Sequence, residues 1–247
     1  MELTVIGCGD AFASGGRVNS CYLLDTAHGL VMIDCGASAP HALARAGIRA
    51  SSADAILISH CHGDHFGGLP SLVLERMFID RTEKPMEILG PPGIESRFES
   101  LMESVYPGIL GVKKRFEITF RDLHPGFAVE WRGLMIEAFE VDHFSGTPSL
   151  ALSVSDGDKQ FSFSGDSGMC GGVIAAGRGA DLYLVECSTY STKVEMHLDY
   201  QRLAAKFPSI GAKRYLLTHM GDEMLASLDR IDTRVCIAAE DGLKVTI

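Results

Sequence analysis

The feature that most constrains this chain is a run of six residues, 60–65, which reads His-Cys-His-Gly-Asp-His and follows an apolar segment at residues 55–58. The apolar segment predicts a short buried strand. Alternate side chains of a strand point to the same side, so His60 and His62 can face one ion. The turn at Gly63 lets Asp64 and His65 reach a second ion. Three histidines and a carboxylate at this spacing are typical of a zinc, iron or manganese site rather than of a solvated loop.

The composition limits what the rest of the chain can do. The chain has 247 residues, of which 46% are hydrophobic, and this is enough for a sizeable core. We expect one domain over residues 1–247, because no linker or low-complexity segment interrupts the pattern. The formal net charge of -10 argues against non-specific binding to nucleic acid, which needs a basic stripe to displace counterions.

Cysteine usage and the amino terminus indicate the compartment. The cysteines are dispersed, odd in number and free of any Cys-x-x-Cys pair: Cys8, Cys21, Cys35, Cys61, Cys170, Cys187 and Cys236. This pattern predicts reduced thiols, and Cys61, which alternation turns away from the neighbouring histidines, is expected to be structural. The amino-terminal apolar run is too short for a signal peptide, and no apolar stretch is long enough to span a bilayer. We therefore expect a soluble cytoplasmic protein.

The order of apolar and turn residues predicts a layered α/β architecture. Strands alternate with helices in the first and last thirds of the chain, and successive strands fill the middle. The expected strands are residues 3–6, 20–25, 30–33, 55–58, 86–89, 116–120, 127–131, 134–141, 150–155, 160–164, 182–185, 214–217, 235–237 and 243–247. The expected helices are residues 39–46, 69–79, 94–105, 200–207 and 223–228. Two such halves predict two sheets packed face to face with helices outside.

Three more polar residues end apolar strands farther along the chain. His143, Asp166 and His219 each follow a predicted strand at the point where it enters a turn. A polar residue is an ordinary way to end a strand, but three repetitions of the same construction predict a common site.

The seven side chains are enough for two metal ions. We expect His60, His62 and His143 on one ion, Asp64, His65 and His219 on the other, and Asp166 between them. A carboxylate that bridges two metals holds them about 3.5 to 4 Å apart, and water between them loses a proton near neutral pH. Such a site supplies a hydroxide nucleophile without any nucleophilic side chain.

This ligand order resembles that of the metallo-β-lactamase superfamily. The likeness covers nearly the whole chain, since residues 7–10 and 31–36 also match the superfamily's opening strands. Within the superfamily, residues 164–167, 185–188, 196–198 and 217–219 resemble the ribonuclease Z and PhnP-like phosphodiesterase branch. The resemblance implies an αββα sandwich of two mixed sheets and two divalent metal ions, zinc by preference and manganese or iron as alternatives.

The resemblance also implies catalytic residues. His197 would donate a proton to the leaving oxygen or bind a phosphate oxygen, with Glu186 orienting its ring. A histidine in a surface loop is the alternative for His197. Asp64 joins them as a candidate catalytic residue, although metal charge would keep Asp64 and Asp166 ionised as ligands rather than as free bases.

Two departures from that branch narrow the expectation. Ribonuclease Z enzymes that clasp transfer RNA insert a long arm between the positions of His143 and Asp166, where this chain has only 22 residues, already occupied by two strands. The chain also lacks the cysteine-rich structural zinc site expected of PhnP-like proteins. Neither transfer-RNA maturation nor the exact PhnP-like activity is therefore expected.

We therefore expect a metal-dependent hydrolase of small phosphodiesters. We expect neither a membrane nor transfer RNA as its partner, and a homodimer is possible. Thioester or lactone hydrolysis is the alternative within hydrolases, because the same hydroxide attacks a carbonyl. A non-catalytic metabolite-binding member of the superfamily is the alternative outside enzymes. Residues 9–18 and 79–84 are the segments expected to border the pocket.

Overall fold

Two sheets of seven strands each form the centre of the structure, a computed structural model that describes residues 1–247. The first sheet has, in spatial order, β14 (Lys244–Thr246), β1 (Glu2–Gly7), β2 (Cys21–Thr26), β3 (Gly29–Ile33), β4 (Ala55–Leu57), β5 (Met86–Gly90) and β6 (Ile118–Asp122). The second has β13 (Cys236–Ala238), β12 (Tyr215–Thr218), β11 (Leu182–Glu186), β10 (Gln160–Phe163), β9 (Ser149–Ser155), β8 (Leu134–Val141) and β7 (Ala128–Trp131). Both sheets contain parallel and antiparallel pairs.

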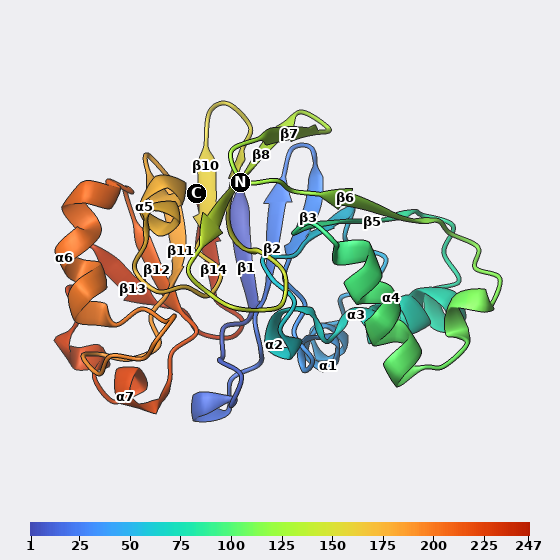
Figure 1. The fold of residues 1–247 in the computed structure, drawn as a ribbon, viewed down its shortest axis with the longest axis horizontal. Helices are drawn as coiled ribbons and strands as arrows, with labels where there is room; N and C mark the ends of the chain where they lie inside the picture. Colours follow the sequence, from blue (N-terminus) through green and yellow to red (C-terminus); the bar gives the residue numbers. More distant parts are fainter.

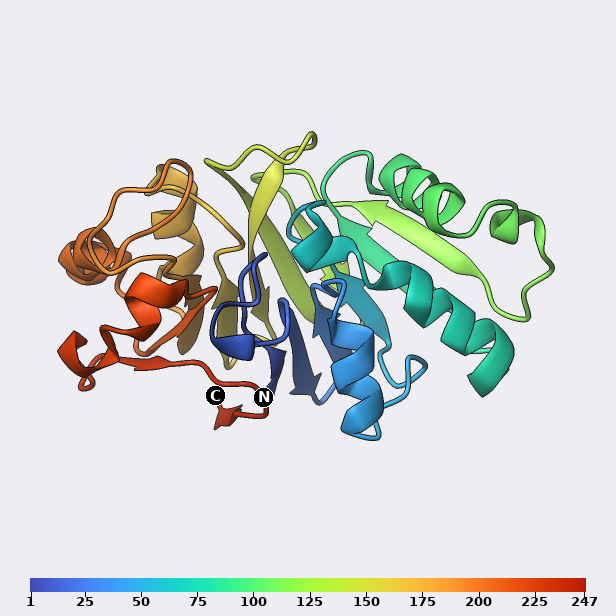
Figure 2. The same cartoon turned by 90° about the horizontal axis from the view of Figure 1, so that it is seen from below.

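Helices cover the outer face of each sheet (Figures 1 and 2). The first sheet is covered by α1 (Ala39–Arg45), α2 (Gly63–Phe66), α3 (Leu69–Leu74) and α4 (Ile94–Val105). The second is covered by α5 (Gly171–Gly177), α6 (Tyr200–Ile210) and α7 (Asp222–Leu225). Short 3₁₀ turns occupy Ser14–Gly16, Ile109–Gly111 and Leu228–Arg230. None of the helices combines the length and the apolar character needed to cross a bilayer.

The largest apolar cluster lies between the two sheets. Strand β8 shows how the sequence builds it: Leu134, Ile136 and Ala138 are buried, and the residues between them are exposed or half-buried. This period of two puts one face of the strand on the core. The cluster combines residues of both sheets, such as Val5 and Phe161, so the predicted αββα sandwich is confirmed.

The directions of the strands bring the candidate residues to one edge. Strand β8 runs antiparallel to β9, which runs antiparallel to β10, and β10, β11 and β12 are mutually parallel. The carboxyl ends of β8, β10, β11 and β12 therefore share one edge of the second sheet. Polar residues that follow these strands meet there because open α/β sheets gather their ligands at the carboxyl ends of strands.

The helix expected after residues 60–65 is shorter than the sequence predicts. The helix expected over residues 69–79 ends at Leu74, and a wider π-helical turn, Glu75–Asp80, follows. This turn buries the Arg76 guanidinium, which donates to the carbonyl oxygens of residues 50, 84 and 85.

Helix α5 was not expected, because it begins with two glycines. A Cβ at Gly172 would lie 2.0 Å from the Glu140 carbonyl oxygen, so the glycine lets the helix pack directly on strand β8.

Candidate metal centre

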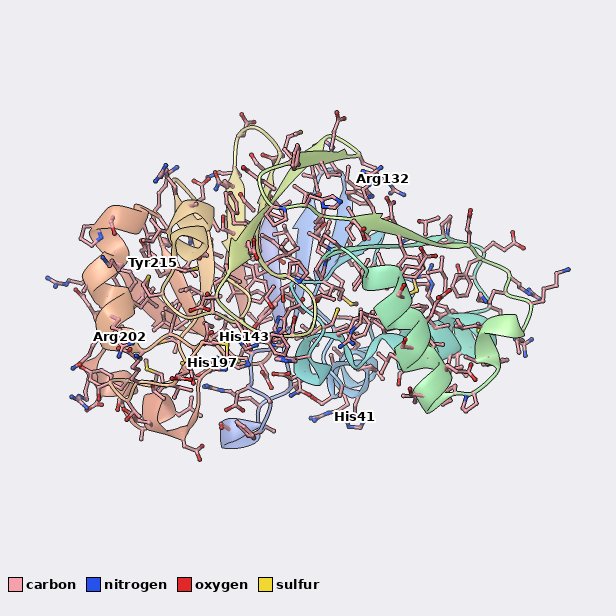
Figure 3. All side chains as sticks on the ribbon, in the orientation of Figure 1. His41, Arg132, His143, His197, Arg202 and Tyr215 are labelled. Atoms are coloured by element: carbon pink, nitrogen blue, oxygen red, sulfur yellow. The ribbon has the colours of Figure 1, made fainter.

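The seven predicted ligand residues come together at the shared edge of the two sheets. His60 and His62 follow β4, and Asp64 and His65 lie in the short helix α2 rather than in the expected turn. His143, Asp166 and His219 follow β8, β10 and β12. Figure 3 shows His143 in the centre of the molecule, where the two halves meet.

The seven side chains form two adjoining groups. In the first, His143 Nε2 lies 3.0 Å from His62 Nδ1, and the His60 ring is 5.0 Å from that of His62 and 4.9 Å from that of His143 between centroids. In each group, one candidate ligand atom per residue lies within 4.8 Å of every other. The second group contains Asp64, His65, Asp166 and His219.

Asp166 lies where the two groups meet. Its carboxylate oxygens are 3.3 Å from His65 Nε2 and 3.2 Å from His219 Nε2, in its own group. One of these oxygens is also 3.8 Å from His60 Nε2 and 3.9 Å from His143 Nε2 in the first group. Asp166 is therefore within reach of both groups, as the bridging position requires.

The donor atoms fit a pair of divalent metal ions. Among these seven side chains, three buried atoms within the cluster have no hydrogen-bond partner: His60 Nε2, His65 Nε2 and Asp166 Oδ1. Unpaired polar atoms in a protein interior are costly, and metal coordination is one way to satisfy them. Imidazole nitrogen with carboxylate oxygen is the donor set that zinc accepts, and the two adjoining groups provide it for two ions.

The electrostatics of the cluster separate neutral from charged imidazoles. Burial holds the pKa of His60 well below its usual value, so its ring is neutral and free to ligate. Burial alone would lower the pKa of His219 too, but Asp166 and Asp64 raise it to about 9. His219 and His65 in turn hold the pKa of Asp166 well below its usual range against the effect of burial. A cation in the cluster would take over the role of these imidazolium charges.

Asp34 supports the cluster from beneath. Its fully buried carboxylate accepts hydrogen bonds from His65 Nδ1 at 2.6 Å, Ser59 N at 2.7 Å and Ser59 Oγ at 2.7 Å. A carboxylate on one ring nitrogen fixes the tautomer and aims the other nitrogen at a metal. Asp34 is not among the residues predicted from the sequence, although it follows strand β3 in the same way that Asp166 follows β10.

A backbone carbonyl orients His143. His143 Nδ1 lies 3.2 Å from the Met196 carbonyl oxygen. Met196 adopts a left-handed conformation, with φ +59°, which is uncommon for a residue other than glycine. No side-chain pattern in the sequence marks this contact.

His197 and Glu186 lie beside the metal cluster. His197 Nδ1 is 3.2 Å from both Glu186 carboxylate oxygens, and its ring stacks on His219 with 5.7 Å between centroids. Figure 3 shows His197 next to His143, and their ring centroids are 5.0 Å apart. Burial alone would lower the pKa of His197, but the Glu186 carboxylate raises it above its usual value. Glu186 is fully buried and also accepts from the Ser167 amide.

A cavity of about 540 Å³ opens onto the cluster. Its walls include His62, His143 and His197, together with Asp10 and Phe12 from the loop after β1. Of the two segments expected to border the pocket, residues 9–18 therefore do so, whereas residues 79–84 do not. His28, His41 and His124 take no part, and Figure 3 shows His41 at the outer edge, on helix α1. Cys61 is buried, and all seven cysteines are free thiols.

The fold and the cluster define a metal-dependent hydrolase of the metallo-β-lactamase superfamily, in its ribonuclease Z and PhnP-like branch. Residues 1–238 match the family described as anti-Pycsar protein Apyc1, and the chain belongs to that family.

Individual relatives show the same branch. Ribonuclease Z of Methanosarcina acetivorans is 26% identical over 307 residues, covering 100% of this chain and 98% of the relative. Ribonuclease Z of Listeria innocua is 32% identical over 163 residues, but the match spans only 51% of that relative.

Two solved structures share the fold over the whole chain. Human tRNase Z, short form, has a TM-score of 0.82 at 24% identity and covers 100% of this chain and 99% of its own. A diphosphatase from the PhnP family has a TM-score of 0.75 at 19% identity, with coverage of 100% and 97%.

Proposed function

We propose that this protein hydrolyses a small phosphodiester at a two-metal centre, with zinc as the metal. His60, His62 and His143 would hold one ion, Asp64, His65 and His219 would hold the other, and Asp166 would lie between them. The position of Asp166 between the two groups carries the proposal. Ions bound there would polarise the phosphoryl group and activate a water molecule.

The side chains around the cluster supply the remaining chemistry. His197 donates a proton to the leaving oxygen, because Glu186 binds its Nδ1 and leaves the other ring nitrogen free. The Glu186 carboxylate raises the pKa of His197 against the effect of burial, which favours the protonated ring that an acid requires. Asp64 acts as a ligand, since the histidines that face it hold its pKa below the usual range against the effect of burial.

Three observations support a small phosphodiester as the substrate. Relatives of this chain include enzymes named ribonuclease Z and a diphosphatase, both of which act on phosphorus-oxygen bonds. The cavity of about 540 Å³ is the size of a small-molecule site. The segment between His143 and Asp166 is taken up by β9, β10 and their turns, so it leaves no arm to hold transfer RNA. We also propose that residues 1–247 act as one domain, because both sheets contribute to the cluster.

Replacing Asp166 tests the proposal. Asp166→Ala should lower the metal content, measured by inductively coupled plasma mass spectrometry, and the turnover of bis-p-nitrophenyl phosphate together. Asp158→Ala is the matched control, because Asp158 is exposed on the turn between β9 and β10. Full metal occupancy with an unchanged rate in Asp166→Ala would contradict the bridging role.

Rates on other esters separate the alternative functions. A thioester and a lactone, assayed beside the phosphodiester, should be hydrolysed much more slowly. Faster hydrolysis of either would assign acyl chemistry to the centre. Full metal loading without hydrolysis of any of the three would favour a metabolite-binding protein.

A further inference from the structure

Phe12 is the most exposed large apolar side chain of the protein. It is 88% exposed, yet it lines the cavity together with five members of the metal cluster: His62, Asp64, His143, Asp166 and His219. Ala11 and Val194 are the only other hydrophobic residues in the wall. A phenyl ring left in water beside an otherwise polar site gains apolar contact only when something covers it.

The loop that carries Phe12 is held in place rather than left free. The buried Asp10 carboxylate accepts from Phe12 N at 3.1 Å, Ser14 N at 2.9 Å and Ser14 Oγ at 2.6 Å. At the far side of the loop, Gly15 packs on Leu225 of helix α7. The ring is therefore presented to the cavity by a fixed backbone.

The rest of this wall is acidic. The cavity contains no lysine or arginine, and Asp10, Asp222 and Glu223 line it in addition to the carboxylates of the cluster. Glu223 Oε1 accepts from the amides of Ser191 and Thr192 and so ties helix α7 to the loop that carries His197. Asp222 is exposed, in the first turn of helix α7.

We infer that this wall selects phosphodiesters whose group remote from the metals is uncharged and apolar, with Phe12 as the residue that binds that group. The inference rests on the proposed phosphodiesterase function and specifies its substrate class. The positive charge that the site would offer is that of the bound ions and of the histidines around them, where the phosphate would lie. A second anionic group on the substrate would face Asp222 and Glu223 without any cation to pair with it, so it would be repelled.

Direct binding measurements test the inference without relying on turnover. Titration calorimetry of the zinc-loaded protein would compare diphenyl phosphate with bis(4-carboxyphenyl) phosphate. We expect diphenyl phosphate to bind at least tenfold more tightly. Phe12→Ala should weaken diphenyl phosphate binding about tenfold, since a stacked aromatic pair and its buried area contribute about that factor. Asp222→Lys should reduce the ratio of the two ligands' dissociation constants about fivefold at low salt, and this reduction should disappear as salt is added.

Two control variants separate the wall from general effects. Phe127→Ala removes another exposed phenylalanine, which is 70% exposed and outside the cavity. Asp229→Lys makes the same charge change at an exposed position after α7 that does not line the cavity. Neither should alter the binding of either ligand, and thermal unfolding would confirm that all four variants are folded.

The kinetic readout distinguishes the two proposals. Phe12→Ala should raise KM for bis-p-nitrophenyl phosphate about tenfold and change kcat much less, because the ring binds substrate and transition state alike. A wild-type protein that binds diphenyl phosphate as expected but hydrolyses no diester would refute the proposed function and leave the binding wall standing. If the protein hydrolyses diesters but Phe12→Ala and Phe127→Ala have the same kinetics, the inference about the wall is wrong and the proposed function stands. Equal binding of the two ligands would have the same meaning.

Discussion

Replacing Asp34 by asparagine would test how far the support beneath the cluster determines metal binding. The carboxylate accepts three hydrogen bonds, and one oxygen serves both His65 Nδ1 and Ser59 Oγ. An asparagine has one oxygen where the carboxylate has two. Its NH₂ group must therefore face either Ser59 N or His65 Nδ1, and one buried donor loses its acceptor.

The structure gives the size of both effects. A buried donor without an acceptor costs about 1–3 kcal/mol, and for a chain of this length about 2 kcal/mol lowers Tm by roughly 4–8 °C. Loss of a carboxylate behind a metal-binding histidine weakens metal affinity by about 10- to 100-fold. We expect Asp34→Asn to lower Tm of the metal-free protein and to weaken its metal affinity.

Competition with a chromophoric chelator would measure the zinc affinity, and calorimetry of the metal-free protein would measure Tm. Asp25→Asn provides the control, because Asp25 is an exposed carboxylate on the neighbouring strand β2. Zinc affinity in Asp34→Asn equal to that in Asp25→Asn would refute the claim that Asp34 orients His65.

Three further predictions concern the acid, a glycine and a surface carboxylate. His197→Ala should keep its metal and lose about 10²- to 10⁴-fold in turnover on an ester with a poor leaving group. Glu186→Gln should move the alkaline fall of the rate to lower pH, because Glu186 raises the pKa of His197. An unchanged pH profile would contradict this role of Glu186. In urea unfolding, Gly165→Ala should destabilise the protein by at least about 1 kcal/mol more than Gly179→Ala. Both positions have positive φ, but only at Gly165 would a Cβ lie 2.7 Å from the Leu150 carbonyl oxygen. Equal losses of unfolding free energy in the two variants would contradict the clash. Burial alone would raise the pKa of Asp54, but the hydrogen bonds that its carboxylate accepts from Leu30 N, Lys84 and Arg132 lower it. The contribution of Asp54 to stability is therefore present above pH 3.8 and lost as pH falls through the depressed pKa. Wild type and Asp54→Asn should converge in stability in acid, and a stability difference that stays constant with pH would contradict this prediction.

The convergence of the candidate ligands could be predicted because most of them follow a strand. His143, Asp166 and His219 share a construction that is local in sequence, and strand direction then brings them to one edge. This prediction did not require the order of strands within the sheet, because the carboxyl ends of adjacent parallel strands lie at the same edge.

The supporting residues could not be assigned in the same way. Asp34 acts through a hydrogen bond to a residue 31 positions away, and Met196 acts through a backbone carbonyl that any residue could supply. Phe12 lies within residues 9–18, which were expected to border the pocket, but the sequence does not single it out, because its exposure follows from the hydrogen bonds of Asp10 and from the packing of Gly15 on α7. Helix α5 was missed because the glycine that allows its close approach to β8 is also a residue that disfavours helices.

The cluster and the wall of the cavity depend on different parts of the fold. Residues 60–65 follow a strand of the first sheet, and the other three members of the cluster follow strands of the second, so the cluster forms only when the sheets pack on their common core. A metal bound there stabilises that packing in proportion to the logarithm of its concentration over its dissociation constant. Phe12 and Asp222, by contrast, lie on a loop and a four-residue helix at the rim, outside the core between the sheets. Substitutions at the rim can therefore change which diesters bind while leaving the metal cluster intact, whereas substitutions beneath the cluster affect every substrate alike.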